Sequence, residues 1–173
     1  KHEDAIYFSK RVTRAVPDGG PIEAHTDLVK KLDYECELAV VLGRDARDVP
    51  AGQTRDYIFG YTILNDVSAR DVQTAHKQWY FGKSLDGFTP IGPCIVTADA
   101  FADYPPRLGI RSFVNGEKRQ DSNTALQIFD IDHVIAELSQ GMTLKAGTII
   151  ATGTPAGVGM GMDPPQFLKP GDV

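Results

Sequence analysis

The sequence has little positive charge and no long apolar run. Its 18 lysines and arginines stand against 23 aspartates and glutamates, which gives a formal net charge of -5 at pH 7. Nucleic-acid-binding domains usually carry a basic patch, so the composition argues against a nucleic-acid partner. No apolar stretch reaches the roughly 18 residues that a membrane-spanning helix needs, so we expect no membrane partner either.

Cysteine is also scarce, and this excludes further classes of protein. Cys36 and Cys94 are the two cysteines of the chain, and neither has a partner at the spacing of a zinc or iron–sulfur motif. Two cysteines also fall short of the disulfide framework of a small secreted domain. We therefore expect reduced thiols and a cytoplasmic location.

The length of 173 residues is enough for one domain with a sizeable core. We expect residues 1–173 to form a single domain that is incomplete at both ends. The strand-like run Ala5–Phe8 comes almost at once, and Lys169–Val173 has the composition of a turn that leads into a further strand.

Strand signals dominate the rest of the sequence. Short apolar or β-branched runs bounded by glycine, proline or asparagine are typical of strands. Such runs cover Glu37–Leu42, Tyr57–Leu64, Cys94–Thr97, Leu108–Val114 and Thr148–Thr152. The Asn115-Gly116 pair after the fourth run predicts a tight hairpin.

Helical signals are fewer. Ser68–Lys77 offers Ser68 as an N-cap, with Asp71 three residues later. Asp130–Gln140 places its apolar residues on one face, and Gly141 follows as a C-cap. Together these patterns predict an α+β fold that is dominated by strands and has short helices and long loops.

The most distinctive motif is acidic. Glu35 and Glu37 are two residues apart, so on a strand both carboxylates point to the same side. The apolar run Ala39–Leu42 indicates that this strand enters the core, where adjacent negative charges are costly. Two solvated glutamates on an exposed edge would show the same spacing. Asp66 adds a third carboxylate after another apolar run, although this residue could equally be an N-cap or a turn residue.

Three carboxylates without a cysteine or histidine favour a hard cation, namely Mg2+, Mn2+ or Ca2+. Three protein ligands leave half of an octahedral coordination shell open. A 2-oxo acid or an enolised 1,3-diketone could fill two of the open positions through neighbouring oxygens, and water could fill the third. The cation would then polarise the substrate as a Lewis acid.

Four blocks of sequence resemble one known family. They are YECELAVVLGRDARDV at 34–49, GYTILNDVSARDVQ at 60–73, QWYFGKSLDGFTPIGP at 78–93 and TGTPAGVG at 152–159. Together they are similar to the catalytic domain of the fumarylacetoacetate hydrolase family. The resemblance extends over nearly the whole chain.

The resemblance implies a mixed β-roll or β-sandwich fold, a homodimer, and Mg2+ or Mn2+ held by Glu35, Glu37 and Asp66. It implies an enzyme acting on acylpyruvates and related small 2-oxo acids or 1,3-dicarbonyl compounds. Hydrolysis of a carbon–carbon bond is the first expectation, beside decarboxylation or tautomerisation through a metal-stabilised enolate. One alternative is an isomerase or decarboxylase of the 2-hydroxyhepta-2,4-diene-1,7-dioate type in aromatic catabolism. An alternative of another class is a non-catalytic domain that binds a metal and an oxo acid.

The resemblance also assigns residues around the metal. Lys83 matches the family's catalytic lysine, whose ammonium group could stabilise a developing enolate. Gln73 matches a substrate-binding glutamine, and Thr154 with Gly153 matches a loop that binds the substrate carboxylate. Apart from the resemblance, these positions could be a surface lysine, a glutamine on an exposed helix face and a glycine-rich turn without a ligand.

One family feature does not match. Hydrolytic members use a histidine and a glutamate three residues apart to activate water, whereas His2 and Glu3 are adjacent here. Hydrolysis needs such a general base. Isomerisation or decarboxylation could proceed with the metal and Lys83 alone.

Overall fold

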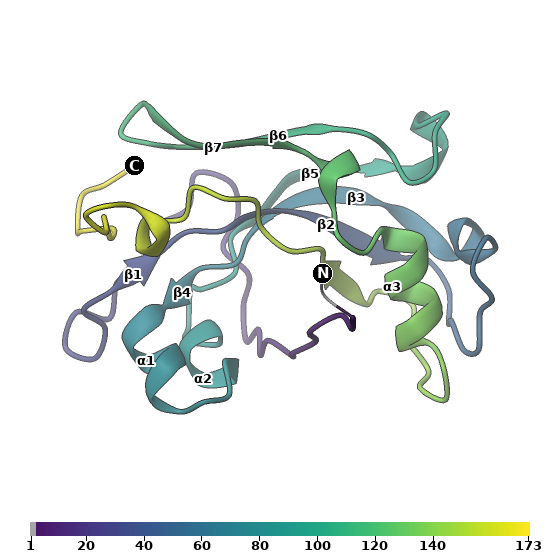
Figure 1. Ribbon diagram of the computed structural model, residues 1–173, viewed down its shortest axis with the longest axis horizontal. Helices are drawn as coiled ribbons and strands as arrows, with labels where there is room; N and C mark the ends of the chain where they lie inside the picture. The colour runs from purple at the N-terminus through teal and green to yellow at the C-terminus, as the bar shows by residue number, and fades with distance from the viewer. Residues whose placement is uncertain (1–2) are drawn as a thin grey trace.

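A four-stranded antiparallel sheet forms the centre of the computed structural model, which describes residues 3–173 (Figure 1). In the order β5-β3-β2-β8, its strands are β5 (Ile91–Thr97), β3 (Ile58–Asn65), β2 (Cys36–Leu42) and β8 (Ile149–Ala151). The hairpin of β6 (Gly109–Val114) and β7 (Glu117–Asn123) lies along one side of this sheet. The expected strand-dominated α+β class is confirmed.

The remaining elements are short. They are β1 (Leu32–Asp33), β4 (Ser68–Ala69), α1 (Arg70–Ala75), α2 (Tyr80–Lys83), α3 (Ile131–Leu138) and the 3-10 turns η1 (Thr54–Tyr57), η2 (Ala98–Ala100), η3 (Thr124–Leu126) and η4 (Gly159–Gly161). β1 pairs with β4 in a second, two-stranded sheet. Long stretches of loop connect these elements, as the sequence predicted.

The main hydrophobic core lies between the central sheet and α3. Every residue of β2 is buried, and Val40 and Leu42 pack in one cluster with Ile131 and Ile135 of α3. A second cluster surrounds the small sheet and includes Leu32 of β1, Ala69 of β4 and Val72 of α1. The chain therefore has two packed regions, and the segments 32–42 and 58–69 run through both.

The predicted strands form with altered ends. The run Cys94–Thr97 is part of a longer strand that starts at Ile91, and Tyr57 belongs to η1 rather than to β3. Asn115 and Gly116 connect β6 to β7 with φ angles of 53° and 80°. This left-handed pair is the conformation that suits the twist of a two-residue hairpin, so the predicted hairpin is confirmed.

Three local predictions are wrong. Ala5–Phe8 joins no sheet; among its side chains, the Tyr7 hydroxyl contacts Glu137. Ser68 is not an N-cap, because it lies in β4 and its hydroxyl donates to the Asp66 carbonyl oxygen. Gly141 is not the C-cap of α3, which is Ser139.

The 3-10 turn η4 contains two glycines, Gly159 and Gly161, and substitutions at them test how closely this turn packs against its neighbours. The N–H of Gly159 donates to Asp33, and a Cβ at Gly159 would collide with the Gln166 carbonyl oxygen. A Cβ at Gly161 would meet its nearest atom, in Val158, at an ordinary 3.7 Å. We expect Gly159→Ala to lower the free energy of unfolding by more than about 2 kcal/mol and Gly161→Ala to change it by less than about 0.5 kcal/mol. Urea unfolding of both variants measures this, and equal stability would contradict the described packing.

Candidate metal centre

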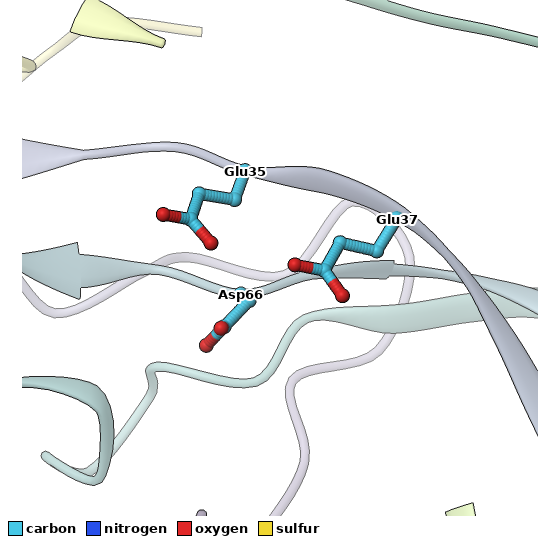
Figure 2. A group of neighbouring side chains, drawn as sticks. All are labelled: Glu35, Glu37 and Asp66. Atoms are coloured by element: carbon cyan, nitrogen blue, oxygen red, sulfur yellow. The ribbon is translucent and has the colours of Figure 1, made fainter. Parts of the chain in front are cut away.

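The candidate site lies where two chain segments pass from one sheet to the other. Glu35 lies between β1 and β2, and Asp66 lies between β3 and β4. The N–H of Asp66 donates to the carbonyl oxygen of Glu35 at 2.9 Å, which holds these two joints side by side. Glu37, the second residue of β2, points to the same side as Glu35 (Figure 2). The antiparallel pairing of β2 with β3 therefore brings the three side chains together.

The three carboxylates form a compact group. Each offers one oxygen atom, and these atoms all lie within 4.8 Å of one another. All three residues are buried. The structure thus gathers the residues that the sequence analysis singled out as metal ligands.

Two buried cations and one partly buried cation contact this group. The Lys83 ammonium bridges two of the carboxylates, at 2.7 Å from Glu35 Oε2 and 2.7 Å from Asp66 Oδ2. Lys10 contacts the other oxygen of Asp66 at 2.6 Å, and Arg70 Nη1 contacts Glu35 Oε1 at 2.6 Å. Lys83 is therefore part of the site and not a surface lysine.

Asp33 holds Arg70 and the turn η4 in place beside this group. Its Oδ2 accepts from Arg70 Nε at 2.9 Å and from the Met160 N–H at 2.9 Å, while Oδ1 accepts from the Gly159 N–H at 2.7 Å. Asp33 thereby fixes the guanidinium that holds Glu35. The sequence analysis did not single out Lys10, Arg70 or Asp33. Arg70 lies inside one of the four sequence blocks and Asp33 directly before another, whereas Lys10 lies far from all of them.

Glu37 differs from the other carboxylates. It accepts a hydrogen bond from the Gly153 N–H at 2.8 Å, and none of the ion pairs among residues 3–173 includes it. Burial raises the pKa of Glu37 to about 8, and the neighbouring charges of Asp66 and Glu35 add to the effect. Three cations balance Asp33, Glu35 and Asp66, so a proton on Glu37 leaves the site neutral.

The donor set fits a hard divalent cation. Carboxylate oxygens are the ligands that Mg2+, Mn2+ and Ca2+ prefer, and a bound cation would offset the burial and the repulsion that raise the pKa of Glu37. The Lys83 ammonium contacts oxygens of the same carboxylates that such a cation would use.

Gln73, Gly153 and Thr154 lie around this centre. Gln73 is buried on α1, not on an exposed helix face, and its Oε1 accepts from Arg70 Nη1 at 3.1 Å. Gly153 uses its N–H on Glu37. The Thr154 hydroxyl donates to the Cys36 carbonyl oxygen at 3.0 Å, so in this structure it is turned toward β2.

The guanidinium of Arg70 has one nitrogen that is still free to donate, and the histidine and glutamate at the start of the chain are considered with it. Arg70 Nη2 is buried and has no hydrogen-bond partner within residues 3–173, so it can donate to an anionic oxygen. Of the adjacent acid–base pair at the start of the chain, Glu3 is exposed, and His2 lies outside the described residues.

Comparison with known proteins identifies the family. The whole chain, residues 1–173, matches the family described as fumarylacetoacetate (FAA) hydrolase C-terminal. The chain therefore belongs to the fumarylacetoacetate hydrolase family, as its sequence blocks indicated.

Named relatives carry out more than one reaction. The chain is 45% identical over 170 residues to the oxaloacetate tautomerase YisK of Bacillus subtilis (strain 168), a match covering 98% of this chain and 56% of that protein. The structure of this chain resembles that of a fumarylacetoacetate hydrolase from Exiguobacterium antarcticum, with a TM-score of 0.85 and 53% identity over 88% of this chain and 54% of that one. It also resembles a 2-hydroxyhepta-2,4-diene-1,7-dioate isomerase from Mycobacterium marinum, with a TM-score of 0.75 and 40% identity over 94% of this chain and 56% of that one. The chain spans little more than half the length of these proteins.

Across residues 3–173, the structure contains no helix with the length and apolar character needed to cross a membrane.

The raised pKa of Glu37 predicts a pH dependence. A carboxyl whose folded pKa lies above its unfolded value of 4.5 stabilises the metal-free protein at low pH, and this contribution is lost as the pH rises through about 8. Metal binding needs the carboxylate and therefore releases this proton. We expect Mn2+ affinity to rise between pH 6 and pH 8, by up to about tenfold per unit, and then to level off. Calorimetric titrations in buffers of different ionisation enthalpy would measure the released proton, and a flat profile would contradict the prediction.

Glu37→Gln and Glu35→Gln should behave differently. Glu37→Gln keeps an acceptor for the Gly153 N–H and resembles the protonated carboxyl, so we expect little change in stability without metal and at least about tenfold weaker Mn2+ binding. Glu35→Gln leaves Arg70 and Lys83 with less compensating charge, so we expect a cost of about 3 kcal/mol or more. Thermal unfolding and Mn2+ titration of both variants measure this. Equal destabilisation by the two substitutions would refute the assigned charge balance.

Proposed function

We propose that this chain carries the metal centre of an enzyme that acts on small 2-oxo acids, acylpyruvates or related 1,3-dicarbonyl compounds. The observation that carries the proposal is the group of three buried carboxylates with a buried lysine among them. When bound by Glu35, Glu37 and Asp66, Mg2+ or Mn2+ would supply a Lewis acid that polarises the substrate's neighbouring oxygens.

The protein's own cations account for recognition of an acid. Arg70 Nη2 is a buried donor with a free hydrogen-bonding position among residues 3–173, and it lies on the guanidinium that holds Glu35. A substrate carboxylate would satisfy this donor. Gln73, whose oxygen accepts from the same guanidinium, is placed to orient it, and its amide N–H groups can donate to the substrate.

Lys83 provides the charge that the reaction needs. Removing a proton or a carboxylate next to a polarised carbonyl produces an enolate, and a nearby ammonium stabilises that negative charge. The step is common to tautomerisation and decarboxylation, and the relatives named above include a tautomerase and an isomerase. Carbon–carbon bond hydrolysis stays a prediction that also needs a general base for water. The homodimer expected from the resemblance likewise stays a prediction.

A substrate panel tests the proposal. Oxaloacetate, an acylpyruvate and a dienoic diacid are assayed with Mg2+ and with Mn2+, for the wild type, Lys83→Met and Lys145→Met. Lys145 is a matched control because its side chain is 72% exposed and pairs with Asp45 on the surface. We expect turnover of at least one compound, loss of turnover with EDTA, and a fall in kcat of at least about 100-fold in Lys83→Met alone.

Other results would favour the alternatives. Binding of the oxo acids without turnover of any of them would indicate a non-catalytic binding domain. If calorimetric titration with Mg2+ and Mn2+ gives no heat of binding, the metal centre is rejected altogether. The products distinguish the reactions, because tautomerisation conserves the carbon skeleton, decarboxylation releases CO2 and hydrolysis yields two acids.

A further inference from the structure

Gln120 is a fully buried amide in β7 that lies outside the metal centre. Its side chain makes four hydrogen bonds. Oε1 accepts from the Cys36 N–H at 3.1 Å and from the Ser112 hydroxyl at 2.9 Å. Nε2 donates to the Thr154 hydroxyl at 2.7 Å and to the Pro155 carbonyl oxygen at 2.8 Å. An amide offers two donors and two acceptor positions, so every position is used and the side chain cannot rotate without losing bonds.

One end of this amide fixes the backbone between two of the carboxylates. Cys36 lies between Glu35 and Glu37, so its peptide orients both. The Cys36 N–H is held by Gln120, and its carbonyl oxygen accepts from the Thr154 hydroxyl at 3.0 Å. Because β2 begins at Cys36, these bonds fix the backbone from which both side chains project, Glu35 just before the strand and Glu37 within it.

The other end fixes the loop that holds Glu37. Gln120 binds Thr154 and Pro155, and the preceding residue, Gly153, donates its N–H to Glu37 Oε2 at 2.8 Å. A shift of this loop would therefore move the hydrogen bond that orients Glu37. Gln120 thus joins the strand and the loop from a hairpin that supplies none of the three carboxylates.

We propose that Gln120 is a positioning residue for the metal centre, which it acts on through the Cys36 peptide and the 153–155 loop. The inference rests on the proposed function, since it concerns the same three carboxylates. Partners that orient metal ligands commonly affect affinity by 10- to 100-fold when they are removed. A residue that merely fills the core would change stability and leave the affinity of the folded protein unchanged.

Two variants separate these roles. Gln120→Met keeps the volume and removes all four hydrogen bonds. Gln120→Glu is nearly isosteric, keeps an oxygen toward Cys36 and loses the paired N–H donors toward the loop. Thr124→Val is the matched control, because Thr124 is a buried polar residue next to β7 whose hydroxyl bonds Pro106 and Leu108, away from the site.

Mn2+ binding is measured by electron paramagnetic resonance on protein shown by circular dichroism to be folded, together with KM and kcat for any compound that the wild type turns over. We expect at least about tenfold weaker Mn2+ binding in Gln120→Met, an intermediate loss in Gln120→Glu, and a change below about twofold in Thr124→Val. If Gln120→Met does not fold, the comparison of Gln120→Glu with Thr124→Val decides.

Unchanged Mn2+ affinity in the folded Gln120 variants would overturn the inference, and so would an equal loss in Thr124→Val. These outcomes differ from failure of the proposed function. If the wild type itself does not bind Mn2+, the metal centre is rejected and the inference fails with it.

Discussion

The buried charge balance around Glu35 and Asp66 is the constraint on which the rest of the site depends. Carboxylates and cations removed from water are tolerated only when their partners are placed accurately. Here Lys83 Nζ lies 2.7 Å from an oxygen of each of the two carboxylates, and Lys10 and Arg70 occupy their remaining oxygens. These cations come from segments that are far apart in sequence. Assembly of the site therefore requires the N-terminal segment, both joints between the sheets and α2 to be in place together.

The fold brings these segments together in a simple way. Two chain segments each cross from the small sheet to the central sheet, and the hydrogen bond from Asp66 N–H to the Glu35 carbonyl oxygen joins them at the crossing. Residues at a crossing are free from the alternation of a continuous strand. The side chains of Glu35 and Asp66 converge there with Glu37.

Much of this could be predicted from the sequence, because local patterns decide it. Alternation and apolar runs located the long strands, and the left-handed Asn115-Gly116 pair located the hairpin. The spacing of Glu35 and Glu37 indicated that they share a side. The limits lie where tertiary contacts override local preference. Ser68 has the chemistry of an N-cap, yet it is used in β4 because its hydroxyl bonds the Asp66 carbonyl oxygen. The pairing of Lys10 with Asp66 spans 56 residues, and no spacing rule reaches that far. The roles proposed for Lys83, Gln73, Thr154 and Gly153 came from resemblance, and the structure adds their surroundings.

The proposed function depends on Glu35, Glu37 and Asp66 holding a divalent cation. The most direct measurement is a crystal structure of the protein soaked in Mn2+, with anomalous diffraction recorded for manganese. We expect an anomalous peak within bonding distance of oxygens of Glu35, Glu37 and Asp66. A map without such a peak at saturating Mn2+ would contradict this expectation.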